Sequence, residues 1–573
     1  MHLALVKTCF PVGIGVMRAF SQLLDRLSLE PRRLAKEALL MRYLRETPDP
    51  DRGYALAALT GGLAFKNAKP ALLRSLISDR SDPHLFALSY DFVGDLSETI
   101  ALMWPRSPDA LPAQSAGGPE APSLSQVVGQ LEETGRTQMP GLLTGWLDAL
   151  DETGRWALLK LVTGGLRVGV SARLAKSAVA RLGGLDVAQV EEVWHGLSVP
   201  YRDLFAWVEG RAGPPENDDP APFRPVMLAH PLDEDRDLEQ LRASDFAVEW
   251  KWDGIRVQAA AGRSDKAGDV RRLFSRTGED ISRAFPDIVE LLTFDACIDG
   301  ELLVVSDGAV RPFSDLQKRL NRKTAGPKLI RDYPAAIRAY DILDLEGEDL
   351  RALPFSQRRA RLEAFVAGLA DSKIDLSPMV DAGAWQAIAG ARARPHEHLP
   401  ASDAAAVEGV MLKRWDSVYA AGRPKGLWFK WKQEPRLIDA VLMYAQRGHG
   451  KRSSFYSDYT FGVWRDGEDD PELVPVGKAY FGFTDDELRQ IDRFVRNNTV
   501  NRFGPVREVA HGPDSGLVLE VAFEGLNRSG RHKSGVAMRF PRISRLRWDK
   551  PPAEADRLET LEAMLPEQDP ART

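Results

Sequence analysis

Cysteine and long apolar runs are scarce in this chain of 573 residues, and each absence excludes a class of protein. The two cysteines, Cys9 and Cys297, lie far apart in sequence, which excludes a disulfide framework and a four-cysteine zinc site. No apolar run approaches the ~18–20 residues of a membrane-spanning helix, so we expect no membrane segment. The first sixteen residues contain Lys7 and no small-residue cleavage pattern, which disfavours a signal peptide and makes Met17 an alternative start.

A large excess of one charge is also missing. The formal net charge is −6 at pH 7, and 28% of the residues are charged while 44% are hydrophobic. This balance is typical of a globular protein and argues against a surface that binds nucleic acid everywhere, although it permits local basic patches. The length suits three or four domains of ordinary size.

The hydrophobic pattern divides the chain into one helical and two strand-rich parts. From residue 17 to about 209, apolar residues recur at three- and four-residue spacing, apart from a Pro-, Ala-, Gly- and Ser-rich stretch at 105–123. After a second break at 211–225, short strand patterns alternate with helical ones to about residue 434. Residues 435–553 are again mostly strand-like, and a short helical pattern closes the chain.

One strand pattern carries charges where a buried strand would be apolar. In AVEWKWDGIRVQ, Glu249, Lys251 and Asp253 alternate with two tryptophans, so the three charged side chains share one face of the strand. A single lysine on a strand is most often a surface residue with an exposed ammonium group. The row is therefore either a solvated edge or a reactive site.

A second alternation of tryptophan and lysine favours the reactive site. In WFKWKQ, Lys430 and Lys432 are two residues apart and share a strand face. Neighbouring cations lower the pKa of an amine and so make it a better nucleophile. We expect Lys430 and Lys432 to act in this way on Lys251.

Two carboxylates stand beside glycines at the edges of apolar strands. Glu301 lies in CIDGELLVV and Glu408 in VEGVMLKR, and either one alone is most simply a solvated strand end. Together, with Asp253 as a further candidate, they could bind Mg²⁺ alongside substrate phosphates. Carboxylates and Mg²⁺ among several basic residues indicate phosphoryl or nucleotidyl transfer.

Basic residues accompany these carboxylates along the chain. Each is ordinary as a surface charge, but as a set they predict a site for a triphosphate or for nucleic-acid phosphates. The residues are Arg256, Arg276, Lys413 and Arg423.

Taken in order, seven segments between about residues 249 and 550 resemble the motifs of the ATP-dependent DNA ligases. A lone K-x-D-G would be a weak signal, whereas seven elements in register are specific. The segments are KWDGIR, SRTGED, DGE, AYDILDLEG, EGVMLK, WFKWK and MRFPRISRLRWDK. The chain is most similar to the three-domain type found in archaea, eukaryotic nuclei and some bacteria, including the bacterial ligase B-type enzymes.

The resemblance implies a multidomain fold. It would consist of an all-α DNA-binding domain at 17–213, an α+β nucleotidyltransferase domain (ATP-grasp-like, for adenylation) at 223–434, and a β-barrel OB-fold domain at 435–553. A C-terminal tail at 554–573 would follow. In this family the OB-fold domain acts in two poses, one for the nucleotide and one for DNA.

The resemblance also implies a reaction. Lys251 would attack the α-phosphate of ATP, release pyrophosphate and retain AMP. The AMP would pass to the 5′-phosphate at a nick in duplex DNA, and the 3′-hydroxyl would then displace it. ATP and Mg²⁺ (or Mn²⁺) would be required, and the pathways served would be DNA replication, repair and recombination.

The family's roles are carried over to matching positions. Glu249 would read the adenine, Tyr340 would stack on it, and Arg256 and Glu301 would contact the ribose. Arg276 would hold the nick 5′-phosphate or the AMP. Metal would bind to Glu301 and Glu408. Phosphates would be bound by Lys413, Arg423, Lys430, Lys432, Arg539 and Arg542.

Two segments are candidates for DNA contact. The stretch from 528 to 550 holds eight Lys or Arg against one acidic residue, and GGLRVGVSARLAK is similar to a minor-groove-contacting turn of the family. A plain helix connection is an equally good reading of the second segment. The DNA-binding residues that we expect are Arg167, Gly169, Arg528, Lys533, Arg547 and Lys550.

Other readings share part of this pattern. RNA ligases and mRNA-capping guanylyltransferases use the same lysyl-nucleotide chemistry, but the long helical region and the RWDK ending favour a DNA ligase. A DNA-binding scaffold with an inactive fold is disfavoured by the intact lysines and glutamates. An NAD-dependent ligase would carry a four-cysteine zinc module, which two cysteines cannot form. We expect a monomer that binds nicked duplex DNA and no membrane, located in the cytoplasm with the nucleoid.

Overall fold

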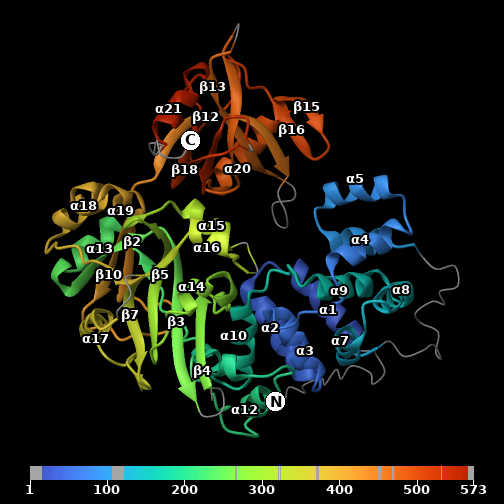
Figure 1. Ribbon diagram of the computed structural model, residues 1–573. Coiled ribbons are helices and arrows are strands. Elements are labelled where there is room, and N and C mark those ends of the chain that lie inside the picture. The colour runs from blue at the N-terminus through green and yellow to red at the C-terminus, as the bar shows by residue number, and fades with distance from the viewer. Residues whose placement is uncertain are drawn as a thin grey trace, which may run out of the picture. The chain divides into compact units, whose positions relative to one another are not determined.

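The computed structural model describes residues 16–105, 122–217, 219–264, 268–320, 322, 324–369, 373–447, 455–467, 470–530 and 532–565. The chain forms two compact units (Figure 1). The first holds the described residues up to Arg311, together with Arg319–Asp381 and Met411–Lys430. The second holds Pro312–Lys318, Ala382–Val410 and the described residues from Trp431 onward. In the described part of the chain, no helix is both long and apolar enough to cross a membrane.

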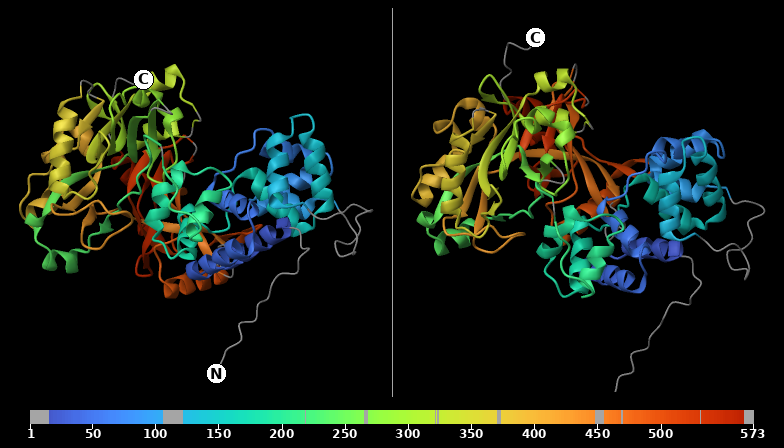
Figure 2. Two further views of the ribbon diagram at one scale, coloured as in Figure 1. Left: turned by 90° about the horizontal axis from the view of Figure 1, so that it is seen from below. Right: turned by 60° about the horizontal axis from the view of Figure 1, so that its bottom comes forward.

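The helical part, residues 16–208, contains helices and no strand among its described residues (Figure 1 and Figure 2). Its helices bury one shared apolar core, to which α1 contributes Phe20, Leu24 and Leu27 at four- and three-residue spacing. The helices are α1 (Val16–Leu29), α2 (Arg33–Glu46), α3 (Asp51–Thr60), α4 (Pro70–Ser78), α5 (Pro83–Val93), α6 (Leu96–Met103), α7 (Leu124–Glu133), α8 (Met139–Ala149), α9 (Glu152–Thr163), α10 (Ala172–Leu182), α11 (Val187–Val193), η1 (Trp194–Gly196) and α12 (Arg202–Val208).

Side-chain caps define where several of these helices begin. Ser123 Oγ accepts a hydrogen bond from the Gln126 N–H at 3.1 Å, and the Gln126 side chain accepts one from the Ser123 N–H at 2.7 Å. This capping box satisfies two backbone donors that would otherwise lack partners. Asp151 caps α9 in a simpler way through the N–H of Gly154.

The end of the helical part contacts the α+β part within the first unit. The carboxylate of Glu192, on α11, accepts hydrogen bonds from both Arg224 and Arg351. The ring of His195, on η1, lies 5.4 Å from the ring of Phe223 and 5.3 Å from that of Phe274. Two ion pairs and an aromatic cluster therefore join the two parts.

The α+β part is built on two sheets. The larger has the strand order β4-β3-β5-β7-β8, with β6 beside β5 and β9 beside β7, and the smaller has the order β1-β11-β10-β2. Helix α17 (Phe355–Ala367) packs on β7. The strands are β1 (His230–Pro231), β2 (Phe246–Trp252), β3 (Ile255–Ser264), β4 (Gly268–Ser275), β5 (Ala296–Ser306), β6 (Ala309–Val310), β7 (Ala335–Leu345), β8 (Glu348–Asp349), β9 (Ile374–Leu376), β10 (Val407–Arg414) and β11 (Trp428–Lys432).

Short helices connect these strands. They lie between strands in the chain. They are α13 (Glu234–Gln240), η2 (Ala243–Asp245), η3 (Ser282–Ala284), α14 (Pro286–Val289), α15 (Phe313–Leu320), α16 (Pro327–Asp332), α18 (Trp385–Ala393), η4 (Pro395–Glu397) and α19 (Ala401–Ala405).

The remaining β part is OB-fold-like and centres on one long strand, β12 (Arg436–Arg447), which pairs with β13, β16 and β17. A register shift between Leu442 and Tyr444 accompanies its pairing with β13. The other elements are β13 (Tyr456–Arg465), β14 (Glu472–Ala479), α20 (Asp485–Asn497), β15 (Thr499–Phe503), β16 (Val506–Val509), β17 (Val518–Phe523), β18 (Gly525–Arg528), β19 (Val536–Arg539), β20 (Arg542–Arg547), η6 (Pro552–Glu554) and α21 (Leu558–Ala563).

The helical pattern at the end of the chain forms α21, which is part of the β core and not a loose extension. Leu558, Leu561 and Leu565 are buried in the same apolar cluster as the strands. The sequence predicts a C-terminal tail at 554–573. Its described part, as far as Leu565, packs into the β part and stabilises it.

A buried ion pair holds α17 to the larger sheet. Arg358 and Asp341, both fully buried, form a two-pronged pair with distances of 2.8 Å (Nε–Oδ1) and 3.0 Å (Nη2–Oδ2). Arg358 also donates to the backbone oxygens of Leu353 and Ser417. Removing one partner of such a pair leaves an uncompensated buried charge.

We expect Arg358→Met to lower the free energy of unfolding of the α+β part by about 3–5 kcal/mol, because Asp341 stays buried without its cation. Urea unfolding of the full chain measures this. Arg361→Met is the control, since Arg361 is 51% exposed and 3.7 Å from Glu348, and we expect a loss of about 1 kcal/mol or less. Equal losses in both variants would contradict this account.

The contact around His195 should respond to pH. Burial, followed by the charge of Lys176, lowers the pKa of His195 to about 4 in the folded chain. The unfolded value is about 6.5, so the unfolded chain binds more protons between these two values. The free energy of unfolding should therefore decrease as the pH falls from about 6.5 towards about 4.

His195→Phe tests this response. The substitution keeps an aromatic ring beside Phe223 and Phe274 but cannot be protonated. Unfolding midpoints of both proteins, measured across the same pH range, should diverge, with a shallower loss of stability at acid pH in the variant. Parallel curves would show that His195 makes no contribution.

Candidate active site

The predicted nucleophile lies where the chain passes between the two sheets. Lys251 is the penultimate residue of β2, and the two residues Asp253 and Gly254 lead into β3 in the other sheet. A Cβ at Gly254 would lie 2.6 Å from the backbone oxygen of Leu302 and 2.8 Å from Cγ of Glu301. Only glycine fits there, and this close approach sets the turn after Lys251 against the strand that carries Glu301.

The tryptophans flanking Lys251 hold the strand in the interior. Trp250 and Trp252 are buried, whereas Lys251 is half-buried. The Trp252 Nε1–H donates to Ser377 Oγ at 3.1 Å, and the guanidinium of Arg338 lies 4.2 Å from the centre of the Trp252 ring. The strand therefore presents Lys251 from a backbone anchored by indole packing.

Glu249, two residues before Lys251, is buried between two cations. It is 1% exposed, accepts a hydrogen bond from Arg359 at 2.8 Å and forms an ion pair with Lys413 at 2.6 Å. Arg359 comes from α17 and Lys413 from β10. Each carboxylate oxygen is thus held by a different element, which orients the carboxylate.

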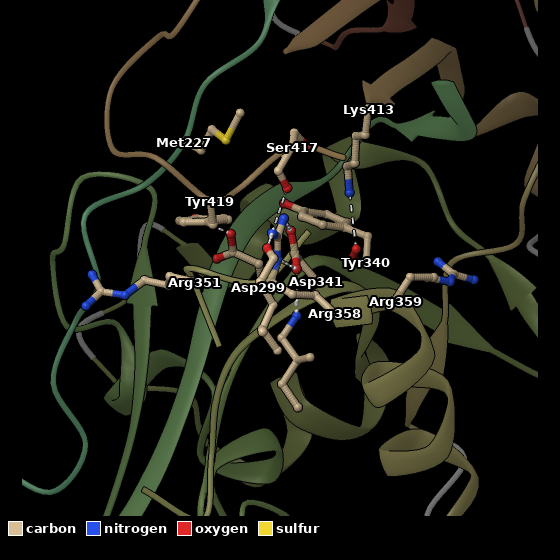
Figure 3. A network of polar contacts seen from close by, with 12 residues as sticks. Met227, Asp299, Tyr340, Asp341, Arg351, Arg358, Arg359, Lys413, Ser417 and Tyr419 are labelled. Atoms are coloured by element: carbon tan, nitrogen blue, oxygen red, sulfur yellow. Dashed lines mark hydrogen bonds and ion pairs between the residues drawn. The ribbon is translucent and has the colours of Figure 1, made fainter. Parts of the chain in front are cut away.

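Lys413 lies deeper than the sequence indicates. It is 1% exposed, donates to the backbone oxygen of Tyr340 at 3.1 Å, and its ammonium lies 4.4 Å from the centre of the Tyr340 ring (Figure 3). Burial lowers the pKa of Lys413, and the charge of Glu249 opposes the shift. The contact expected between Lys413 and a phosphate stays a prediction. The contacts observed for its ammonium are the ion pair with Glu249 and the hydrogen bond to the backbone oxygen of Tyr340.

A second polar cluster surrounds Arg256. Its guanidinium donates to Asp299 at 2.6 Å, to the Tyr419 hydroxyl at 2.9 Å and to the backbone oxygen of Met227 at 2.6 Å. Asp299 is fully buried and also accepts from the Tyr419 hydroxyl at 2.5 Å (Figure 3). Burial tends to lower the pKa of Arg256, but the negative charge of Asp299 outweighs it and raises that pKa.

Two buried polar atoms of this cluster lack a hydrogen-bond partner among the described residues. Asp299 Oδ1 and Arg256 Nε are buried and have no hydrogen-bond partner in the described structure. Arg256 is the cross-strand partner of Glu301, so the two side chains lie on one face of the sheet. Tyr340 adds a half-buried aromatic ring 6.0 Å from the Arg256 guanidinium. An acceptor, a donor and a π face suit a ribose and a base.

The second unit contains the other predicted carboxylate, Glu408, and the second lysine of WFKWK. Lys432 Nζ lies 3.0 Å from Glu408 and 2.9 Å from Glu524. Burial tends to lower the pKa of Lys432, but the hydrogen bonds and charges of Glu524 and Glu408 raise it. A Cβ at Gly409 would lie 2.3 Å from the backbone oxygen of Trp431, so the Glu408 strand and the Lys432 strand approach closely.

The predicted phosphate-binding residues differ in exposure. Arg276 is exposed in the turn after β4, Arg423 is exposed, and Lys430 is half-buried on β11. Arg539 and Arg542 are half-buried on β19 and β20, and the Arg539 guanidinium lies 4.4 Å from the ring of Phe313.

The predicted DNA-binding residues fall into two groups. Arg528 and Lys533 are exposed. Arg547 and Lys550 both bond to the same carboxylate, Asp439, at 3.0 and 2.8 Å. Their charges are therefore partly neutralised by Asp439. The excess of basic residues at 528–550 does not reveal this pairing, because Asp439 lies outside that stretch.

The predicted turn in the helical part lies between α9 and α10. Arg167 and Gly169 have φ values of +50° and +67°. Buried Lys36, from α2, donates to the backbone oxygen of Val168, and a Cβ at Gly169 would lie 2.3 Å from its ammonium. The glycine thus allows Lys36 to brace this turn.

Several residues of the site were not among the predictions. Asp299 stands two residues before Glu301, on the same strand face, and this spacing was an available signal. Tyr419, Arg359 and Glu524 have no such signal, because each reaches its partner across 92 to 163 residues.

Comparison with known proteins shows which family the chain belongs to. The family model for the ATP dependent DNA ligase domain matches residues 226–432, and that for the ATP dependent DNA ligase C terminal region matches 452–550. A probable DNA ligase of Koribacter versatilis is 35% identical over 443 residues, which cover 73% of each chain. DNA ligase 1 of Korarchaeum cryptofilum is 29% identical over 572 residues, 96% of this chain and 99% of the relative.

A solved structure named Pmar-Lig_PreS3 has a TM-score of 0.53 at 17% identity and covers 92% of this chain and 99% of its own. This likeness shows the fold alone. Two sheets around a strand-borne lysine, followed by an OB-fold-like part, define a multidomain nucleotidyltransferase. The chain belongs to the ATP-dependent DNA ligases, enzymes that use ATP to form phosphodiester bonds and seal nicks in DNA.

The pairing of Glu249 generates a test. We expect Arg359→Gln to raise the KM for ATP about tenfold in adenylate formation, with little change in kcat, because Glu249 loses one of its two cations while Lys251 stays in place. Initial rates over a range of ATP concentrations measure this. Glu363→Gln is the control, since Glu363 also pairs with Arg359 but its side chain is 51% exposed. An unchanged KM in Arg359→Gln would show that the pair does not orient Glu249 for ATP.

Proposed function

We propose that this ligase works through a covalent adenylate on Lys251. The Lys251 amine attacks the α-phosphorus of ATP, a nitrogen–phosphorus bond forms, and the bond to pyrophosphate breaks as the amine gives up a proton. The 5′-phosphate at a nick then attacks the phosphorus of this adenylate, the nitrogen–phosphorus bond breaks, the lysine amine regains a proton, and the AMP is joined to the DNA end. The 3′-hydroxyl attacks this activated phosphate, AMP leaves, and the strand is sealed. The observation that carries the proposal is the position of Lys251 between buried Glu249 and the Gly254 turn, against the Glu301 strand.

The nucleotide contacts follow from the two clusters. Glu249 reads the adenine, held by Arg359 and Lys413, and Tyr340 stacks on the base. Arg256 and Glu301 contact the ribose, and Asp299, which accepts a hydrogen bond from Arg256, orients its guanidinium. Lys413 contacts phosphate in this proposal, and its ammonium, buried against Glu249, also positions that carboxylate.

Phosphate and metal contacts complete the proposal. Glu301 and Glu408 supply carboxylate oxygens, the ligands that Mg²⁺ or Mn²⁺ prefers, and one or two carboxylates suffice where substrate phosphates add ligands. In the described residues no group of three or more metal-ligating side chains gathers. The metal neutralises phosphate charge when bound. Phosphates bind to Arg276, Arg423, Lys430, Lys432, Arg539 and Arg542.

DNA contacts are proposed for both ends of the chain. Arg167 and Gly169 present the braced turn of an all-α DNA-binding domain at 17–213, and Arg528, Lys533, Arg547 and Lys550 lie on the β part. The adenylation domain spans 223–434, and the OB-fold barrel spans 435–553 with the segment from 554 attached. The protein acts as a monomer on nicked duplex DNA and associates with the nucleoid, where its substrate is.

Intact mass spectrometry tests the central step. Incubation with ATP and Mg²⁺ should add the mass of one AMP to Lys251, and nicked duplex DNA should remove it. EDTA should prevent the addition. Lys251→Ala should lose the adduct and all sealing of ordinary nicks, a fall of several orders of magnitude, because the substitution removes the amine that forms the nitrogen–phosphorus bond.

A pre-adenylated nick separates the roles of Lys251. The variant should still seal this substrate, since only the final attack by the 3′-hydroxyl is required. Failure on both substrates would show that Lys251 is structural. An AMP adduct at another residue would overturn the assignment.

A further inference from the structure

A basic surface on the β part uses none of the residues assigned above. We call it the arginine face, and it consists of Arg447, Arg496 and Arg507 around Tyr456, together with Arg502 opposite Arg507. The guanidinium carbons of Arg447, Arg496 and Arg507 lie 5.7, 5.7 and 5.9 Å from the centre of the Tyr456 ring. Three cations from β12, α20 and β16 therefore gather over one buried ring.

Strand register brings the same residues together independently of these distances. Arg447 is opposite Tyr456, and Arg507 is opposite Ala445, which is two residues before Arg447 on β12. Arg502, on β15, is opposite Arg507. Directly opposite residues share a sheet face, as do residues two apart on a strand. A row of arginines thus crosses three adjacent strands on one side of the sheet.

Negative charge on this face is sparse. Asp492, on α20, accepts from Arg496 at 2.7 Å and from the Tyr456 N–H at 3.0 Å, so its carboxylate is already used. Glu508 is next to Arg507 and so points to the other face. Among the described residues, no carboxylate forms an ion pair with Arg447, Arg502 or Arg507.

The pairing of Arg502 with Arg507 is unfavourable without an anion. Like charges directly opposite each other destabilise a sheet. Arg507 donates to the backbone oxygen of Gly504 at 2.7 Å, which uses only part of its five-donor guanidinium. Arg447 and Arg502 are exposed to solvent. Uncompensated, exposed guanidinium groups in a row are suited to phosphates, which they bind through paired hydrogen bonds.

We propose that the arginine face binds backbone phosphates of the DNA substrate. This rests on the function proposed above, in which the β part meets DNA. A row that crosses three strands offers several cations in succession, which suits a repeating phosphate chain better than a single ion. The β15–β16 hairpin also exposes Phe503, which is 54% accessible and can lie against a sugar or base. Arg447, Arg496, Arg502 and Arg507 provide the phosphate contacts.

Salt dependence of DNA binding tests the proposal. The full chain is titrated against a fluorescent nicked duplex without ATP or metal, between about 50 and 200 mM salt. Each phosphate contact contributes about −0.9 to the slope of log affinity against log salt. Arg447→Gln with Arg507→Gln should make the slope shallower by about two and weaken binding on the order of tenfold at the higher salt.

Two controls separate charge and position from folding. Arg465→Gln removes the same charge from β13, where Arg465 is paired with Glu472, and should leave slope and affinity unchanged. Arg447→Lys with Arg507→Lys keeps both charges and should keep most of the slope. Thermal unfolding should show no loss of stability in the glutamine variant, because it removes like-charge repulsion.

Mass spectrometry on the same preparations separates this proposal from the proposed function. If the glutamine variant forms the Lys251 adenylate and binds nicked DNA with the wild-type slope, the arginine face does not bind DNA, whatever else it binds. If wild-type protein forms no adenylate at Lys251, the proposed mechanism fails, and the salt slopes still decide whether these arginines contact DNA.

Discussion

The site depends on a carboxylate that is taken out of water and must be paired. Glu249 is almost fully buried two residues before Lys251, and an unpaired charge there would cost several kcal/mol. Its partners, Arg359 and Lys413, come from α17 and β10, more than a hundred residues further along the chain. The strand that carries Lys251 is therefore in place only when α17 and the smaller sheet have both assembled.

Several of the basic residues expected to bind phosphates form ion pairs with carboxylates of the same chain. Lys432 is held by Glu408 and Glu524, while Arg547 and Lys550 share Asp439. A phosphate that binds these cations has to compete with carboxylates of the same chain. Among the described residues no carboxylate forms an ion pair with Arg447 or Arg507, so their positive charge is not compensated in that part of the chain.

Much of the site could be predicted because its signals are local. Alternation along a strand made Lys251 and Glu249 candidates, and their roles stay predictions. The order of the motifs predicted an ATP-dependent DNA ligase, which the family comparisons confirm. The depth of Lys413 was missed, because EGVMLK has the same alternation whether its lysine faces a phosphate or a buried carboxylate. Arg359 and Tyr419 were missed because nothing near them in sequence indicates their partners.

The sequence by itself determined the elements and the chemistry of this protein: strand alternation, helix spacing and motif order depend on neighbours within a few residues. Only the tertiary structure decided which charges are paired and buried. It formed the ion pairs of Lys413 with Glu249 and of Lys432 with Glu524, and it packed α21 into the apolar core of the β part. It also aligned Arg447, Arg502 and Arg507 across three strands. These outcomes depend on contacts between residues far apart in the chain, and short-range periodicity carries no information about them.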